Sequence, residues 1–166
     1  CGGSGIPDGE CDCDGNIDLG CGCDLPGPSG CDNQCDSTLV LDECGICGGD
    51  GPADNFTCDG TFIPYTKDAL ETAVDLWVSD NATALSTYGE INDWNVSLIT
   101  DMSSLFSSKT TFNDDISSWD VSSVTTMTYM FRLASSFNQD LSGWDVSSVT
   151  DMQGVFESAL SFNDDI

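Results

Sequence analysis

Histidine is absent from the sequence and basic residues are scarce: only Lys67, Lys109 and Arg132 stand against 29 acidic residues. The formal net charge of −26 repels nucleic-acid phosphates and anionic membranes, so we expect neither as a partner. Without histidine, and without a thiol after residue 58, the usual nucleophile and base pairs of enzymes cannot be assembled. We therefore predict that the protein is not an enzyme.

Long apolar runs are missing as well. No stretch reaches the roughly 18 apolar residues of a membrane-spanning helix, and the first residues lack the basic and hydrophobic regions of a signal peptide. We expect no direct membrane insertion in this segment, and either a signal that has been removed or a longer parent chain.

Cysteine is confined to one part of the chain, because all 10 cysteines lie between residues 1 and 58. Such a density is typical of a small secreted scaffold held together by disulfides in an oxidising compartment. A zinc site is disfavoured, because histidine is absent and the cysteine spacings do not form two matched pairs. We therefore predict an extracellular or cell-surface protein with an irregular disulfide-stapled segment over residues 1–60. Its disulfides, whose pairing the sequence leaves open, are formed by Cys1, Cys11, Cys13, Cys21, Cys23, Cys31, Cys35, Cys44, Cys47 and Cys58.

Three Asn-x-Ser/Thr sequons agree with secretion. They begin at Asn55, Asn81 and Asn95, and each would carry a covalently attached glycan if the source is a eukaryote.

Oxygen-bearing side chains alternate in the first part of the cysteine-rich segment, at Asp12, Asp14, Asn16 and Asp18. This two-residue spacing is used by calcium loops, but the bidentate glutamate of an EF-hand is missing. Both a calcium site and a solvated acidic turn are compatible with the pattern. No other cofactor is expected.

The cysteine-rich segment also contains a recognisable string, Asp-Glu-Cys-Gly-Ile-Cys-Gly-Gly-Asp-Gly, from Asp42 to Gly51. It resembles the DECGxCGGDG-type modules of large secreted proteins, which are similar in style to thrombospondin type 3 repeats. The resemblance is confined to this segment and implies little about function.

The second half of the chain repeats with a period of 25 residues, in three segments that align without a gap: 91–115, 116–140 and 141–165. The aligned apolar columns are Trp94, Trp119 and Trp144; Val96, Val121 and Val146; Met102, Met127 and Met152; Phe106, Phe131 and Phe156; and Phe112, Phe137 and Phe162.

Within one repeat, Ile116, Trp119 and Val121 follow the spacing of leucine-rich repeats, in which alternating side chains of a short strand point inward. Next, Val124, Met127, Met130 and Phe131 are spaced like one face of a helix. We thus predict an α/β solenoid of leucine-rich-repeat type over 91–166, with one short strand and one short helix per 25-residue repeat.

Residues 61–90 are expected to form the N-terminal helical cap of this solenoid. Thr66 is placed to cap a helix that runs to about Ser79, with Leu70, Val74 and Trp77 on its apolar stripe. No polar cap follows the last repeat, so we expect that further repeats or another molecule cover that end.

The string from Phe112 to Phe131, Phe-Asn-x-Asp-Ile-Ser-x-Trp-Asp-Val-Ser-Ser-Val-Thr-x-Met-x-x-Met-Phe, resembles BspA-type leucine-rich-repeat surface proteins. The resemblance spans residues 91–166. It implies a stack of strand and helix units on secreted or surface-anchored proteins that are often linked to adhesion, and it brings no active site.

Polar columns accompany the apolar ones. Asn113, Asn138 and Asn163 are expected to hydrogen-bond the backbone of adjacent turns as a structural ladder. The column of Asp115, Asp140 and Asp165 is expected to bond backbone N–H groups, or else to share a cation. Outward positions that include Asp120 and Asp145 form either a binding face or a merely solvated one.

Together these features predict a non-enzymatic structural protein of a cell surface, matrix or extracellular filament. It would assemble through repeat stacking and head-to-tail contacts between copies of itself. The alternative is an adhesin that recognises a protein or glycan through its repeat face.

Overall fold

The computed structural model describes residues 19, 21, 28, 30–35 and 37–163, and the chain divides into two compact units, Cys1–Pro52 and Ala53–Ile166. The boundary lies before the one expected near residue 60, because Phe56 packs with the second unit. Its ring lies 5.6 Å from that of Phe62 and 6.4 Å from that of Tyr88.

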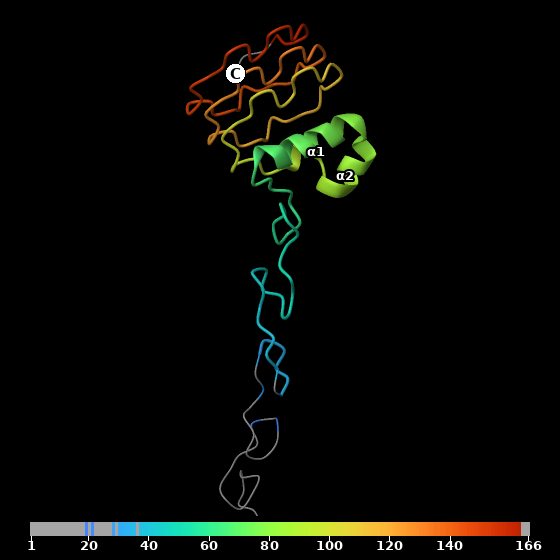
Figure 1. Cartoon of the computed structure of the whole chain (residues 1–166), viewed down its shortest axis with the longest axis vertical. Coiled ribbons are helices and arrows are strands. Elements are labelled where there is room, and N and C mark those ends of the chain that lie inside the picture. Colours follow the sequence, from blue (N-terminus) through green and yellow to red (C-terminus); the bar gives the residue numbers. More distant parts are fainter. Residues whose placement is uncertain (1–18, 20, 22–27, 29, 36, 164–166) are drawn as a thin grey trace, which may run out of the picture. The chain divides into compact units, whose positions relative to one another are not determined.

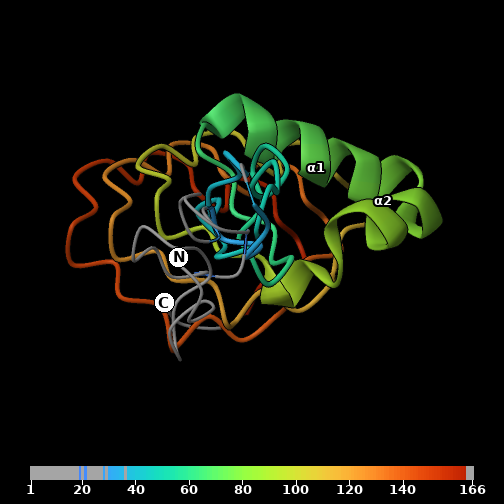
Figure 2. The same ribbon diagram turned by 90° about the horizontal axis from the view of Figure 1, so that it is seen from below.

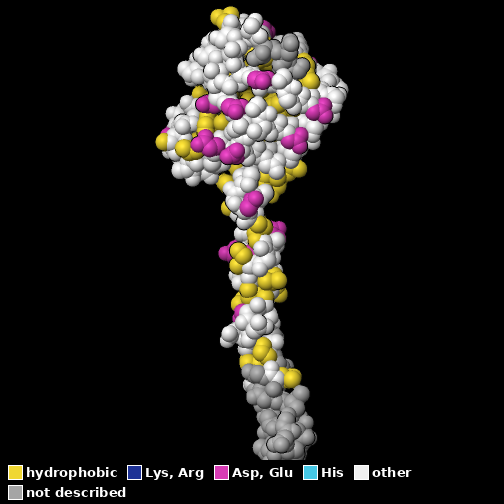
Figure 3. All heavy atoms as spheres, turned by 180° about the vertical axis from the view of Figure 1, so that it is seen from behind, with side chains coloured by type: hydrophobic (Ala, Val, Ile, Leu, Met, Phe, Trp, Pro, Cys, Tyr) yellow, Lys and Arg dark blue, Asp and Glu magenta, His cyan; other side chains and the backbone are white. Residues whose placement is uncertain are grey.

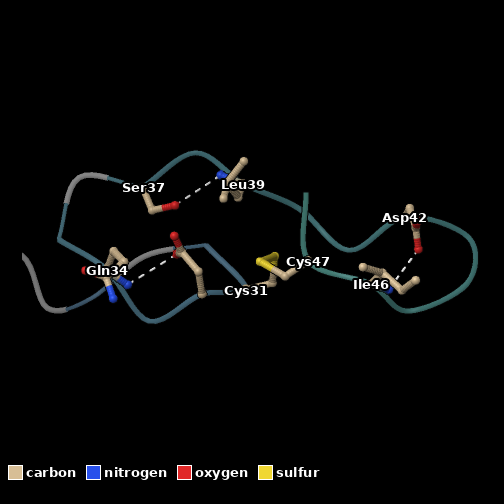
Figure 4. The surroundings of a disulfide bond; sticks show 8 residues. Cys31, Gln34, Ser37, Leu39, Asp42, Ile46 and Cys47 are labelled. Atoms are coloured by element: carbon tan, nitrogen blue, oxygen red, sulfur yellow. Dashed lines mark hydrogen bonds between the residues drawn. A yellow bond between two sulfur atoms is a disulfide. The ribbon is translucent and has the colours of Figure 1, made fainter. Parts of the chain in front are cut away.

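The described part of the first unit is a set of turns joined by disulfides. Cys21 is bonded to Cys35 and Cys31 to Cys47, and an antiparallel bridge pairs Leu41 with Cys47. Figure 4 shows the Cys31–Cys47 disulfide between the two loops that it joins. Cys44 and Cys58 are disulfide-bonded as well. The remaining cysteines and the expected calcium ligands lie outside the described residues: Cys1, Cys11, Cys13, Cys23, Asp12, Asp14, Asn16 and Asp18.

The second unit begins with a helical layer. Helix α1 spans Lys67–Ser79, and the Thr66 hydroxyl caps it by accepting a hydrogen bond from the Ala69 N–H. This helix and its cap are confirmed as predicted. Helix α2 spans Asn81–Tyr88, and the 3₁₀ helix η1 spans Ile91–Asp93.

The repeats follow as turns that run side by side, coloured yellow through orange to red in Figure 1. Figure 2 shows the same turns from below, with α1 beside them. Neighbouring turns are joined by backbone hydrogen bonds, such as those from Met102 N–H to Thr126 O at 3.0 Å and from Met127 N–H to Asp151 O at 2.9 Å. Isolated parallel bridges at residues 101, 126 and 151 mark the same ladder.

The local structure of each turn differs from the expected strand and helix. Among the described residues after Asp93 there is neither an α-helix nor an extended strand, and the parallel pairing occurs where the helix was expected. Instead, hydrogen bonds between residues three apart form successive tight backbone turns within a repeat, from Met130 N–H to Met127 O and from Ala134 N–H to Phe131 O. Tight backbone turns of three residues space their apolar side chains much as an α-helix does. The spacing of apolar residues alone therefore cannot distinguish a series of such turns from a helix.

The core of the turns consists of rows of identical aromatic rings. Phe131 stacks on Phe106 at 5.1 Å and on Phe156 at 5.4 Å, and Phe137 stacks on Phe112 at 5.8 Å. Phe106 and Phe131 are fully buried. Phe156 is only partly buried, and in its column one described ring, that of Phe131, stacks on it. The burial of each turn is therefore supplied by its neighbours.

The tryptophan column adds hydrogen bonds to this packing. Trp119 donates from its indole Nε1–H to Ile91 O at 2.7 Å, and Trp144 donates to Ile116 O at 3.2 Å. Because Trp94, Trp119 and Trp144 are at most 6% exposed, they do not offer a stacking platform to a sugar.

Candidate functional site

The outward positions of the turns form a regular polar surface. We call it the polar face and define it by Asn95, Ser97, Asp120, Ser122, Asp145 and Ser147. In each turn the side-chain Oδ1 of the first residue accepts a hydrogen bond from the N–H of the serine two positions later, at 3.2, 3.1 and 3.0 Å. This is the Asx-turn, in which a short polar side chain takes the place of a backbone carbonyl.

The Asx-turns set the charge state of the polar face. A hydrogen bond from the Ser122 side chain, together with its backbone N–H, holds the pKa of Asp120 below its ordinary value. Hydrogen bonds from Ser147 lower the pKa of Asp145 in the same way. Both carboxylates are exposed, and hydrogen bonding to the charged form favours ionisation. The structure thus brings Asp120 and Asp145 to equivalent positions as two anionic groups.

A second acidic row lies at Asp115 and Asp140, and it is also bonded to backbone. Asp115 accepts from Ser117 N–H at 2.9 Å and Asp140 from Ser142 N–H at 2.9 Å. These bonds lower the pKa of both carboxyls, while the charge of Asp140 opposes the effect at Asp115. Of the two roles expected for this column, backbone bonding is the one observed at these positions; Asp165 lies outside the described residues.

The asparagine column forms a ladder between turns. Asn138 N–H donates to Asn113 Oδ1 at 2.8 Å, and Asn163 N–H donates to Asn138 Oδ1 at 3.1 Å. Each amide side chain thereby satisfies a backbone group of the next turn, which holds the turns in one register.

A hollow of about 450 Å³ opens beside the first turn of the polar face, where it is lined by Asn92, Asp93, Trp94, Asn95, Ser97, Ser118 and Asp120. Asn92 connects two turns at this point, because its Oδ1 accepts from Ser118 N–H at 3.0 Å and its Nδ2 donates to Asp115 at 3.2 Å. The volume lies within the range of pockets that hold small ligands. The sequence does not reveal the hollow, because the residues that line it come from two turns.

The basic residues do not neutralise the polar face. Lys67 pairs with Asp101 at 3.2 Å, and Lys109 pairs with Asp75, so both lysines link α1 to the first repeat. Arg132 pairs with Glu157 of the next turn at 3.3 Å. On the surface in Figure 3, acidic side chains are spread among uncharged ones, and no described Lys or Arg is visible.

The loop from Asp42 to Gly51 is organised by a carboxylate that the sequence analysis did not single out. Asp42 Oδ1 accepts from Cys44 N–H at 2.9 Å and from Ile46 N–H at 2.8 Å, and its Oδ2 accepts from Gly51 N–H at 3.0 Å. Figure 4 shows the bond to Ile46. These bonds, led by that from Ile46, lower the pKa of Asp42. An aspartate at the start of a tight turn is the sequence signal for a carboxylate that accepts hydrogen bonds from the backbone N–H groups of that turn.

The three sequon asparagines lie in different surroundings. Asn55 has a φ of 64° and accepts from Tyr65 N–H at 3.1 Å. Asn81 is the first residue of α2 and is exposed. Asn95 belongs to the polar face.

The described residues include neither a metal-binding cluster nor a membrane-spanning helix. No group of three or more His, Cys, Asp or Glu is arranged there to hold a metal ion. None of the helices in that part of the chain has the length and apolar character to span a bilayer.

The comparison with protein families gives one match. The model of a family described as Mycoplasma protein of unknown function, DUF285, matches residues 74–166, which is more than half of the chain. No curated protein and no solved structure matches. The disulfides indicate an oxidising environment, so the chain is an extracellular or cell-surface protein.

Proposed function

Because the chain belongs to the DUF285 family, whose function is unknown, we propose its role from its architecture: a non-enzymatic structural protein of a cell surface, matrix or extracellular filament. Its repeat region is a solenoid of stacked 25-residue turns, similar to BspA-type surface proteins but without the strand and helix of a leucine-rich repeat in the described turns. Its loop from Asp42 to Gly51 is a secreted module of the thrombospondin type 3 style.

The pairing between turns is the observation that carries this proposal. Met127 donates to the following turn and its counterpart Met102 donates to the turn of Met127, so successive turns use equivalent contacts. The stacked phenylalanine rows repeat in the same way. Each turn thus pairs one of its faces with the opposite face of the next turn. Such a head-to-tail stack can be extended by further copies, whether they belong to the same chain or to another molecule.

The proposal also fits the charge of the chain. A net charge of −26 opposes the approach of two copies, and this repulsion weakens as salt shortens the Debye length from about 10 Å at 0.1 M to about 3 Å at 1 M. Self-association is therefore expected to strengthen with salt.

Sedimentation velocity and electron microscopy of the complete protein test this role over a range of salt concentrations. We expect assemblies that grow with protein and salt concentration, and a spacing of about 4.8 Å between stacked turns within them. A protein that stays monomeric under all these conditions is not a self-assembling structural element.

A second candidate function is an adhesin, which the exposed carboxylates of Asp120 and Asp145 and the adjacent hollow favour. Binding to cells and to glycan arrays would be compared between the native chain and an Asp120→Asn/Asp145→Asn variant made in bacteria. The amides keep the Asx-turn, as Asn95 does, but remove both charges.

The matched control for this binding test is Asp54→Asn/Asp68→Asn, which removes two charges outside the polar face. A loss of binding in the first variant alone supports the adhesin. Equal binding by the native chain and both variants excludes recognition through these carboxylates.

A further inference from the structure

The sequon at Asn95 occupies a special place in the repeat pattern. Asn95-Val96-Ser97 aligns with Asp120-Val121-Ser122 and with Asp145-Val146-Ser147, so a single Asp-to-Asn difference creates the sequon in the first turn. Asn95 keeps the turn of its counterparts, because its Oδ1 accepts from both Ser97 N–H and the Ser97 hydroxyl, as Asp120 does with Ser122.

We propose that, in a eukaryotic secretory pathway, Asn95 carries an N-linked glycan whose first N-acetylglucosamine lies in the hollow beside it, and that this glycan covers the N-terminal part of the polar face. The inference does not depend on the role as a filament subunit, and in an adhesin it would leave the carboxylates of Asp120 and Asp145, rather than the hollow, for recognition. It gives the polar face one glycosylated position at Asn95, followed by anionic positions at Asp120 and Asp145.

The geometry of the Asx-turn leaves one atom of Asn95 for attachment. Its Oδ1 is occupied by Ser97, whereas its Nδ2 has no hydrogen-bond acceptor among the described residues. A glycan is attached to Nδ2, so the modified side chain can retain both hydrogen bonds of the turn. Glycosylation of the unfolded chain is therefore compatible with the folded turn.

The surroundings of Asn95 suit a sugar. The hollow of about 450 Å³ is lined by hydroxyl, amide and carboxylate groups, including Ser97, Ser118 and Asp93. Asp93 makes no side-chain hydrogen bond to another described residue, which leaves its carboxylate available to sugar hydroxyls. Neither Asn55 nor Asn81 lines this hollow.

The modification is a group transfer from a lipid-linked oligosaccharide diphosphate. The Asn95 Nδ2 forms a bond to C1 of the sugar and loses one proton to a base of the transferase. The C1–O bond to the lipid diphosphate breaks, and the diphosphate leaves with the electron pair. No oxidant or reductant is needed.

The test exchanges residues between equivalent turns. The complete protein is secreted from a eukaryotic host as the native chain, as Asn95→Asp and as Asp120→Asn, which creates a sequon in the second turn. Glycopeptides are mapped by mass spectrometry with and without peptide N-glycosidase. We expect a glycan on Asn95 of the native chain, loss of that glycan alone in Asn95→Asp, and one additional glycan in Asp120→Asn.

Stability separates glycosylation from folding in this test. Asn95→Asp restores the residue found in the other turns, so when both chains are produced in bacteria, without glycans, its melting temperature is expected to match that of the native chain. An unmodified Asn95 in the native chain overturns the proposal. A failure of Asp120→Asn to gain a glycan overturns the role of the turn geometry.

The position of the sugar is tested by hydrogen exchange after the glycans are trimmed to one N-acetylglucosamine. The amides of Ser97 and Ser118 are expected to exchange more slowly in the native chain than in Asn95→Asp. Equal exchange rates would show that the sugar does not lie in the hollow.

Discussion

At the scale of single residues, short acidic side chains act as substitutes for backbone acceptors. Asp42 closes its loop by accepting hydrogen bonds from three backbone N–H groups. A Cβ on Gly49 would overlap the Asp42 carboxylate. Gly49 therefore provides the space that the carboxylate occupies. Asp120 and Asp145 perform the same task in the turns, each with one serine.

This role of the carboxylates predicts how stability depends on pH. Their folded pKa values lie below that of an unfolded aspartate, about 3.9. The stability that they contribute is therefore fully present above that value and is lost as the pH falls through the folded pKa. In bacterially produced Asp120→Asn/Asp145→Asn, the amide does not titrate, so acidification from neutral pH should lower the melting temperature less than in the native chain.

Thermal unfolding followed by circular dichroism checks this, at high salt to screen the repulsion between acidic groups. The control is again Asp54→Asn/Asp68→Asn, whose native carboxylates accept no hydrogen bond within the described structure. If acid lowers the melting temperature equally in both variants, the Asx-turns do not cause the pH dependence.

A second prediction concerns Gly154, where φ is 59°. Ser104 and Tyr129 adopt the same backbone conformation at equivalent positions, but a Cβ on Gly154 would overlap the Tyr129 ring. Gly154→Ala should therefore lower the free energy of unfolding by about 1–3 kcal/mol, measured by urea denaturation. In a Tyr129→Ser background the part of the loss due to the clash should disappear, and only the cost of a positive φ for alanine should remain. An undiminished loss there would rule out the clash as a cause.

At the scale of elements, the sequence predicts what depends on composition and misses what depends on backbone geometry. The helix after Thr66 could be predicted because a capping residue and an apolar stripe coincide. The asparagine ladder follows from a polar column at the repeat period. The turns around Tyr129 could not be predicted, because its positive φ is typical of glycine and asparagine and not of tyrosine. The hollow beside Asn95 was missed because it is formed by residues from two turns.

The phenylalanine rows allow a test of how much each turn gains from its neighbours. Phe131 has a ring stacked on each side, whereas Phe156 is stacked on Phe131 within the same column. Phe131→Ala is expected to lower the free energy of unfolding by about 3–5 kcal/mol. Phe156→Ala should cost less, because its side chain is only partly buried. Urea denaturation of both variants measures the difference, and equal losses would contradict burial by stacking.

At the scale of the whole molecule, the two units are stabilised by different means. Unit Cys1–Pro52 contains the two described disulfide pairs, which close loops of 14 and 16 residues. A disulfide that closes a loop of this size adds about 3 kcal/mol to the free energy of unfolding, because it restricts the unfolded chain. Residues 61–166 contain no cysteine and rely on buried apolar rows.

Reduction should therefore unfold the first unit and leave the second unit folded. With a strong reductant, amides around Cys31 and Cys47 are expected to lose their protection from hydrogen exchange, while those of Met127 and Phe131 keep theirs. Hydrogen exchange followed by mass spectrometry resolves the two units in one sample. Loss of protection in both would show that the turns depend on the disulfides for their stability.

The asparagine ladder has a consequence for how such a protein can change over generations. Each rung joins residues 25 positions apart, so inserting or deleting one codon between two rung asparagines would change the spacing of the rung that joins them. Gains and losses of whole 25-codon units preserve the rungs, while exposed positions such as Asp120 and Asp145 can be substituted without disturbing them. Genes for this architecture are thus expected to differ in length by complete units and to diversify mainly along the polar face.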